Sequence, residues 1–279
     1  MKLTILGSGG FRRTPRPGCH CPICEDARKN KTQRLGCSLF LHDENILFDT
    51  PEEIAAELEN AGIEKIDHLF FTHWHPDHTL GARILEIMNT KWSEKLEWRM
   101  VARAKTQVYM PGPVHDEIMS RFGPFFEFWE MLGIAHINKM NGSVQAGKVK
   151  VEAVIIKTMH RTMTHSTAYI VSNGESKFVY APCDITPFPE DERFRDCVLM
   201  ILQAGWHGPE MAERARNGPH YEISLDEIVE IAKKYTPGRV ILTHIGDEVG
   251  LLPDDIKLLE KKYAWMNLEF AYDGMEIEI

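Results

Sequence analysis

The hydrophobic and polar positions along the chain fall into short apolar runs and polar turns, with amphipathic stretches between them. Short apolar runs bounded by turn residues predict buried strands, here at residues 2–6, 37–41, 45–48, 67–71, 149–156, 168–171, 177–181, 197–202 and 239–243, with a final strand pair within 268–279. Apolar positions at helical spacing predict helices near 50–61, 79–88, 125–132, 224–235 and 254–263. Capping boxes are predicted at Thr50 with Glu53 and at Ser224 with Glu227.

A dense group of metal-binding side chains follows the predicted strand at 67–71. Three imidazoles and one carboxylate lie within six positions, at His73, His75, Asp77 and His78. Imidazole nitrogen and carboxylate oxygen are ligands for zinc, manganese or iron. A polar surface turn would rarely place four donors directly at a strand exit, so the pattern favours a metal site.

Further polar residues occupy the ends of other predicted strands. His160, Asp184, His207 and His244 each lie at or just beyond the carboxyl end of an apolar run. This repeated placement predicts that several strand ends converge on one site.

A cysteine loop forms a second candidate metal site. Cys19, Cys21 and Cys24 have the C-x-C-x-x-C spacing, which suits a tetrahedral structural zinc with a fourth ligand from elsewhere. Three unrelated thiols and an iron–sulfur cluster are the alternatives, and a cluster would usually need a fourth cysteine. The remaining cysteines are interpreted as core residues: Cys37, Cys183 and Cys197.

Composition narrows the functional classes. The 279-residue chain has a formal net charge of -9, which argues against broad electrostatic capture of nucleic acid. No apolar run approaches the length of a membrane span, and the first residues read as a strand rather than a signal peptide. We therefore expect a cytoplasmic protein with no membrane partner, in which cysteines are thiols or metal ligands.

The ligand pattern resembles the metallo-β-lactamase superfamily of metal-dependent hydrolases. The resemblance is carried by His73-x-His75-x-Asp77-His78, then His160, Asp184 and His244, in that order, and it runs over nearly the whole chain. It implies an α+β fold in a single domain over 1–279: an αββα four-layer sandwich of two mixed sheets with helices on the outer faces.

Within that superfamily the chain is similar to the phosphodiesterase branch that includes the phosphoribosyl cyclic phosphodiesterase of phosphonate breakdown. The similarity rests on the Gly7–Gly10 turn with the cysteine loop, on Gly218-Pro219-His220 and on Thr243-His244-Ile245. It implies a structural zinc at the cysteines and His220 as general acid. The branch has a second histidine where this chain has Asp247, so Asp247, a water or His20 is the expected fourth zinc ligand.

The resemblance also implies a role for each ligand. Asp184 bridges two Zn²⁺ or Mn²⁺ ions; the ligands of one are His73, His75 and His160, and those of the other are Asp77, His78 and His244. Asp77 is thereby both ligand and catalytic residue. His160 is favoured over His165 as the ligand, and His165 and His207 are interpreted as residues that face the substrate.

The predicted function is hydrolysis of a small cyclic or nucleotide-like phosphodiester. The alternatives are a tRNA 3′-processing endonuclease, an ester, thioester or lactone hydrolase of the same fold, and a non-catalytic binding protein related to cofactor biosynthesis. The aromatic-rich stretch at 90–145 is read as an insertion that forms an extra core layer, a lid or a homodimer face.

Overall fold

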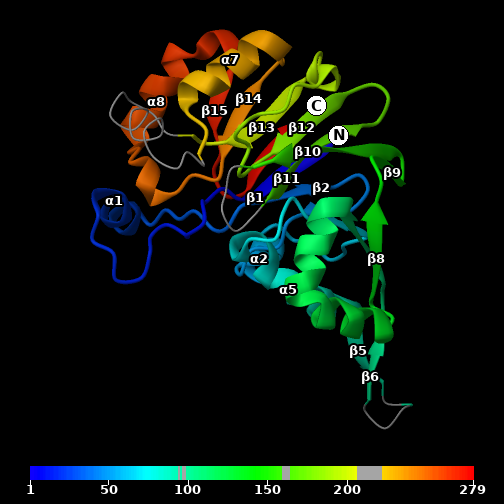
Figure 1. Ribbon diagram of the computed structural model, residues 1–279. Helices are drawn as coiled ribbons and strands as arrows, with labels where there is room; N and C mark the ends of the chain where they lie inside the picture. The colour runs from blue at the N-terminus through cyan, green and yellow to red at the C-terminus, as the bar shows by residue number, and fades with distance from the viewer. Residues whose placement is uncertain (94, 96–98, 159–163, 206–221) are drawn as a thin grey trace.

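Two large β-sheets face each other in the computed structural model, which describes residues 1–279 apart from 94, 96–98, 159–163 and 206–221 (Figure 1). Among the described residues each sheet has seven strands. The first sheet has the order β16 (Met275–Glu278), β1 (Lys2–Gly7), β2 (Ser38–Leu41), β3 (Ile46–Phe48), β4 (His68–Phe70), β7 (Thr106–Pro111) and β8 (Ala135–Met140). The second has the order β15 (Leu268–Phe270), β14 (Val240–Thr243), β13 (Leu199–Gln203), β12 (Lys177–Ala181), β11 (His165–Ser172), β10 (Val149–Lys157) and β9 (Ser143–Ala146).

Both faces of the central strands are buried, which explains why their sequences are continuously apolar. Side chains alternate along each strand: Ile201 of β13 joins the core between the sheets, whereas Met200 and Leu202 join the core on the outer face. The inter-sheet core contains stacked and tilted aromatic rings, including Phe48, Phe70 and Tyr169.

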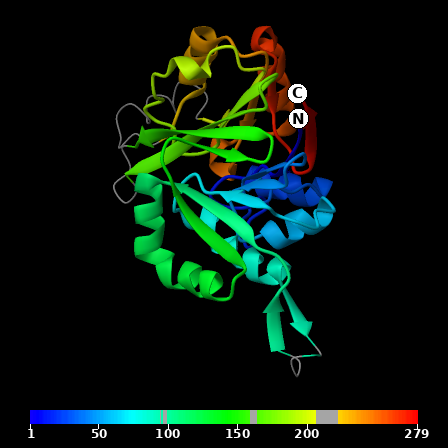
Figure 2. The ribbon, with the colours of Figure 1, turned by 90° about the vertical axis from the view of Figure 1, so that its right-hand side faces the viewer.

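Helices cover the two outer faces, so the predicted αββα sandwich is confirmed. On the first sheet lie α2 (Ile54–Asn60), α3 (Pro76–Thr79), α4 (Ile84–Asn89) and the long α5 (Gly112–Met131). On the second sheet lie α7 (Leu225–Tyr235) and α8 (Pro253–Lys262), and α1 (Pro22–Asn30) stands at the side, as Figure 2 also shows. Short 3₁₀ turns complete the chain: η1 (Leu80–Arg83), η3 (Glu192–Phe194), η4 (Asp247–Val249) and η5 (Ala264–Met266).

Parallel pairing brings the predicted site residues to one edge of the sandwich. β3, β4 and β7 are parallel neighbours in the first sheet, and β12, β13 and β14 are parallel neighbours in the second. Carboxyl ends of parallel strands lie at the same sheet edge. The segments after β3, β12 and β14 carry Asp49, Asp184 and His244. The segment after β4 carries His73 to His78, which we call the histidine loop.

Several local predictions differ from the structure. The Ser224–Glu227 capping box is present, but the Thr50–Glu53 box is wrong, because α2 begins after Glu53 and has no side-chain cap. The helix predicted at 79–88 is divided into α3, η1 and α4. The final strands do not pair: β15 is parallel to β14 in one sheet, and β16 is antiparallel to β1 in the other.

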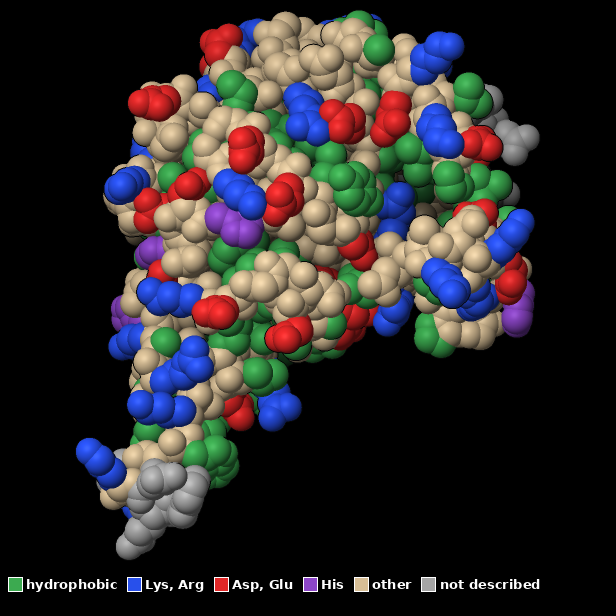
Figure 3. Space-filling view, turned by 180° about the vertical axis from the view of Figure 1, so that it is seen from behind, with side chains coloured by type: hydrophobic (Ala, Val, Ile, Leu, Met, Phe, Trp, Pro, Cys, Tyr) green, Lys and Arg blue, Asp and Glu red, His purple; other side chains and the backbone are tan. Residues whose placement is uncertain are grey.

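The stretch at 90–145 divides into parts with different surroundings. β7, α5 and β8 belong to the first sheet and its outer layer, while the hairpin of β5 (Thr90–Ser93) and β6 (Arg99–Ala102) projects from the body. Figure 3 shows Lys and Arg side chains along this hairpin, where Lys91 and Arg99 are exposed. Among the described residues, no helix combines the length and apolar character needed to cross a membrane.

Candidate active site

The histidine loop connects β4 to α3. β4 ends at Phe70, and Pro76 starts α3 with its fixed backbone angle, which places His75 at the N-cap. Thr79 then donates its hydroxyl to the carbonyls of Trp74 and His75, at 3.0 and 2.9 Å. The loop is therefore closed on itself before any metal binds.

One cluster joins this loop to the segment after β12. Oδ2 of Asp184 lies 3.7 Å from Nε2 of His73 and 3.3 Å from Nδ1 of His75. A ligand atom from each of the three residues lies within 4.8 Å of the others. Their spacing suits a single small cation.

A second cluster adds the segment after β14. Oδ2 of Asp77 lies 3.4 Å from Nε2 of His78 and 3.3 Å from Nε2 of His244. The rings of His78 and His244 are stacked with centroids 5.4 Å apart. The structure thus brings six of the predicted binuclear ligands together in two groups, His73, His75 and Asp184 in one and Asp77, His78 and His244 in the other.

Three residues at this edge have the left-handed backbone conformation that is uncommon for side-chain-bearing residues. The φ angles are +61° at Asp49, +50° at Asp184 and +59° at His244. Asp49 and His244 directly follow parallel strands, and Asp184 lies three residues after the end of another, where the turn redirects the chain. Such conformations persist where the surrounding structure over-determines them, often at functional sites.

Asp49 fixes the position of the histidine loop through hydrogen bonds. Its buried carboxylate accepts hydrogen bonds from the backbone N–H and the hydroxyl of Thr72, at 2.8 and 2.7 Å. It also lies 2.9 Å from Nδ1 of His78. A carboxylate that accepts Nδ1–H fixes the tautomer and leaves Nε2 for a metal.

Opposite charges lie close together in this site. Burial alone would raise the pKa of Asp77, but His78 and His244 lower it well below its usual range. Burial alone would lower the pKa of His78, but Asp77 and Asp49 raise it to about 9.

The residues fit divalent metal ions by their donor chemistry. Nε2 of His78 is buried and makes no hydrogen bond among the described residues. A buried polar atom without such a partner is costly unless something else binds it. Nitrogen and carboxylate donors suit zinc or manganese. The thiol of Cys183, which the sequence assigned to the core, also lies within reach of His73 and His78.

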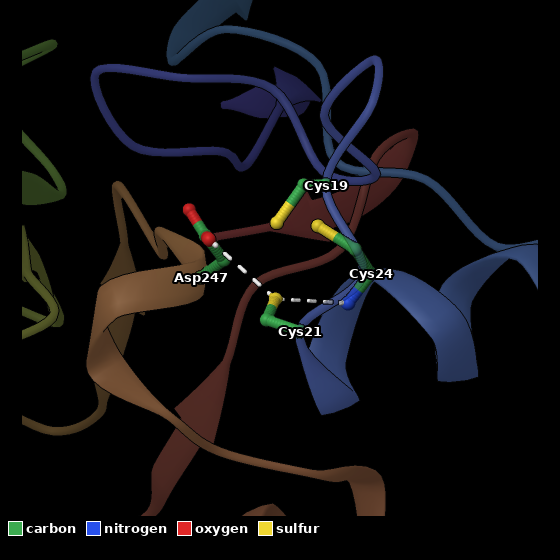
Figure 4. A group of neighbouring side chains, drawn as sticks. All are labelled: Cys19, Cys21, Cys24 and Asp247. Carbon is green, nitrogen blue, oxygen red and sulfur yellow. Dashed lines mark hydrogen bonds between the residues drawn. The ribbon is translucent and has the colours of Figure 1, made fainter.

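The cysteine loop forms a separate group with Asp247 (Figure 4). The ligand atoms of Cys19, Cys21, Cys24 and Asp247 lie within 4.8 Å of one another, and Figure 4 shows the three sulfurs facing the carboxylate that η4 supplies. The Sγ of Cys21 lies 3.6 Å from Oδ2 of Asp247. His20, by contrast, is turned outward, with Nδ1 at 2.7 Å from Glu25 and a side chain 83% exposed. Asp247, and not His20, therefore lies at the fourth position of this group.

Arginine surrounds the cysteine group. Nη2 of Arg16 lies 2.7 Å from Oδ2 of Asp247 and 3.1 Å from Sγ of Cys19. Hydrogen bonding from the backbone of Cys21, with Arg16 nearby, lowers the pKa of Cys19 to about 7. These contacts favour the thiolate of Cys19, the form that binds zinc, whereas burial and the neighbouring thiols raise the pKa of Cys21.

Three predicted residues lie outside the described residues: His160, His207 and His220. Their assigned roles stay predictions. His165 is the first residue of β11, where its Nδ1 lies 3.1 Å from Oε1 of Glu117 on α5.

Several residues near the site were not predicted as part of it. Asp49 directly follows β3, and no function was predicted for it. Glu222 accepts a hydrogen bond from Gln203, and burial together with the charge of Asp184 raises the pKa of Glu222 to about 7. Glu117 lies in the middle of a helix with no motif around it. Asp49 could have been found from the sequence, because it directly follows a predicted strand. Nothing in the sequence around Glu117 or Glu222 indicates a functional site.

Comparisons with known proteins agree with this fold. A family model for the beta-lactamase superfamily domain matches residues 44–245. A curated octanoyltransferase of Porphyromonas gingivalis is 31% identical over 99% of the chain, which spans about half (51%) of that relative's length.

Solved structures are similar over the whole chain. A diphosphatase from the PhnP family has a TM-score of 0.73 at 21% identity, covering 100% of this chain and 97% of the other. Zinc-bound PqqB of Methylobacterium extorquens has a TM-score of 0.75 at 14% identity, covering 100% of both chains. At these identities the two structures support the fold alone.

Proposed function

Because the chain belongs to the metallo-β-lactamase superfamily, whose members are metal-dependent hydrolases, we propose that it is a two-metal phosphodiesterase acting on a small phosphodiester. The observation that carries the proposal is the pair of adjacent clusters built by one loop. His73 and His75 meet Asp184, and Asp77 and His78 meet His244. A structural role would need neither two groups nor buried imidazoles at a sheet edge.

Bound divalent metals would activate water near neutral pH and neutralise charge on the phosphate oxygens. In the proposed enzyme His73, His75, His160 and Asp184 would hold one metal, and Asp77, His78 and His244 would hold the other. The protein holds its ligands ready: Asp49 and Thr72 orient the loop, so little reorganisation is required when substrate binds. His220 stays the sequence-based prediction for protonating the leaving oxygen.

A separate Zn²⁺ at Cys19, Cys21, Cys24 and Asp247 is part of the proposal. Three thiolates and one carboxylate oxygen make a closed tetrahedral set, which is typical of structural rather than catalytic zinc. The diphosphatase among the similar structures shares the fold at 21% identity, so the choice of a phosphorus ester as substrate rests on the ligand pattern and not on that structure.

A second candidate function, hydrolysis of an acyl ester or thioester, is favoured by a specific observation. The relative that matches nearly the whole chain is named for octanoyl transfer. An apolar cavity of about 590 Å³ also lies next to the end of α3, and it is lined by Thr79, Leu80, Phe122, Phe125, Phe126 and Trp129 among others; no residue of the two clusters lines it. Metal-activated water attacks carbonyl carbon as readily as phosphorus, so pocket walls decide between them.

Two further alternatives receive less support. A tRNA 3′-processing nuclease would need extensive phosphate contacts, whereas the net charge is -9. A non-catalytic binding protein would need metal only at the cysteines, which leaves the six histidine-site ligands unexplained.

Metal analysis followed by an activity panel tests the proposal. The purified protein should bind about three metals per chain and hydrolyse bis(p-nitrophenyl) phosphate faster than p-nitrophenyl octanoate. Asp184→Asn should abolish most activity and lower metal content, while His220→Ala should leave metal content intact. Preference for the octanoate ester would favour the second function. One zinc per chain with no hydrolysis of either ester would contradict both.

A further inference from the structure

A carboxylate–histidine pair lies beside the metal clusters but belongs to neither. Oε1 of Glu117 on α5 lies 3.1 Å from Nδ1 of His165. We propose that His165, oriented by Glu117, is the proton donor to the oxygen that leaves when the substrate is cleaved, in place of His220, to which the family resemblance assigns this step. The inference rests on the proposed hydrolase function but holds for a phosphodiester or a carboxylic ester alike.

The strand pleat places His165 on the site side of the second sheet. Tyr169 and Val171 of β11 face the inter-sheet core, whereas Ala168 and Ile170 face the outer core. His165 shares the face of Tyr169 because side chains four positions apart point the same way. The hydroxyl of Tyr169 donates to the carbonyl of Phe71, two residues before His73, at 2.6 Å.

Neighbouring contacts tie this strand end to the site. Ser166 donates its hydroxyl to the carbonyl of Cys183 at 3.0 Å, directly before Asp184. Thr167, on the same face as His165, is fully buried, and its hydroxyl has no hydrogen-bond partner among the described residues. A polar ligand group or water at this face would satisfy it.

Glu117 fixes the orientation of the imidazole. Its Oε1 also accepts hydrogen bonds from the backbone N–H of Thr164 at 3.3 Å and from the Thr164 hydroxyl at 2.5 Å. Because an ionised carboxylate can only accept, Nδ1 of His165 carries the hydrogen in this contact. Nε2 is then the nitrogen that can exchange a proton with a substrate. The side chain of His165 is 28% exposed, so a ligand can reach it.

α5 contacts both the histidine loop and the start of β11. One helical turn after Glu117, the Arg121 guanidinium lies 4.2 Å from the centre of the Trp74 ring in the histidine loop. Residues four apart occupy the same face of a helix. This face of α5 therefore spans the histidine loop and the start of β11, which makes Glu117 a positioning residue that acts through His165.

The proposed step is balanced. Water adds through its oxygen to the phosphorus or carbonyl carbon, and the bond to the leaving oxygen breaks. The leaving oxygen takes the proton from Nε2 of the His165 imidazolium, which becomes neutral imidazole. The proton released by the attacking water passes to solvent, from which the imidazole is protonated again.

The experiment compares good and poor leaving groups on His165→Gln. Thymidine 5′-phosphate is used as its p-nitrophenyl and methyl esters, and octanoic acid as its p-nitrophenyl and ethyl esters. Nitrophenolate leaves without a proton, whereas an alkoxide needs one. We expect kcat for the alkyl ester to fall about 100-fold, the scale of general-acid catalysis, and kcat for the nitrophenyl ester to fall less than about threefold.

His136 provides the matched control. Its Nδ1 lies 3.1 Å from Glu130 Oε1, the same contact as in the His165 pair, but it lies near the start of β8, at the opposite edge of the sheet. His136→Gln should change neither kcat nor the leaving-group dependence. Glu117→Gln should show a smaller fall of the same kind, and Glu117→Gln combined with His165→Gln should be no worse than His165→Gln alone.

Equal losses with both leaving groups, or a change in KM alone, would overturn the proton-donor role while leaving the hydrolase function intact. Additive effects of the two substitutions would show that Glu117 does not act through His165. A wild-type protein that cleaves none of the four esters would overturn the proposed function and this inference together.

Discussion

The two candidate metal sites differ in what holds them. In the histidine site, six ligands come from segments after three strands, and Asp49 fixes the loop from a fully buried position. In the cysteine site, three ligands lie within six residues of one loop and the fourth comes from η4, with arginines in place of a buried carboxylate. The first site is preorganised by the core, whereas the second contributes to holding its own loop.

The backbone links these sites, so they are separate but not independent. Ile245 donates its N–H to the carbonyl of Ser8 at 2.8 Å, and Gly9 bridges to Ile245. A side chain on Gly10 would come within 2.9 Å of the Gly246 nitrogen, which explains the glycine-rich turn. The segment from His244 to Asp247 therefore carries one ligand to each site.

The largest difference between the sites is expected on removing the charge of Asp49. Asp49→Asn should weaken zinc affinity at the histidine site about 10- to 100-fold, because His78 loses the carboxylate that fixes its tautomer. Zinc at the cysteines should bind as before. Chelator competition titrations resolve the two affinities.

Asp67→Asn is the matched control, since this aspartate at the opposite end of β4 accepts from Asn45 at 2.9 Å. Equal weakening of both sites by Asp49→Asn would mean that Asp49 acts on the whole fold rather than on the histidine loop.

Glu57 is a useful comparison because its side chain is buried like that of Asp49 but accepts fewer hydrogen bonds. Ser38 donates to it at 2.5 Å, and burial raises the pKa of Glu57 to about 8. The unfolded chain therefore releases this proton first as pH rises, so folding stability falls between the unfolded and folded pKa values.

Wild type should lose roughly 2 kcal/mol relative to Glu57→Gln between pH 5 and pH 7, as measured by urea denaturation. Parallel pH profiles for the two proteins would show that Glu57 is ionised in the fold. In that case a buried carboxylate would stay ionised although it accepts few hydrogen bonds. The number of donors would then not explain a difference between Glu57 and Asp49.

The smallest effect is expected at Asp247. Asp247→Ala should lower the melting temperature by about 2–4 °C for each kcal/mol of lost zinc binding, and should reduce metal content by about one ion. Asp247→His should retain the ion, because imidazole is a good zinc ligand.

Glu248→Ala is the control, since Glu248 is the next residue and pairs with Arg12 at 3.6 Å. Full zinc content in Asp247→Ala would exclude Asp247 as the fourth ligand and leave water in that place.

The sequence by itself determined the strands outside residues 90–146, the local ligand groups and, through the family resemblance, the layer arrangement; it did not predict β5 to β9. Apolar runs specify strands because burial on both faces requires them, and His73 to His78 or Cys19 to Cys24 lie close in space because they are close in sequence. The Ser224–Glu227 box is likewise a contact over three residues.

Only the tertiary structure decided which distant groups support these ligands. Asp49 meets His78 across 29 positions, Glu117 meets His165 across 48, and Cys21 meets Asp247 across 226. Such pairs depend on strand order and on turns after parallel strands, which one-dimensional periodicity does not encode. A carboxylate in the middle of a helix, such as Glu117, is solvated or functional according to what the sheet edge brings beside it.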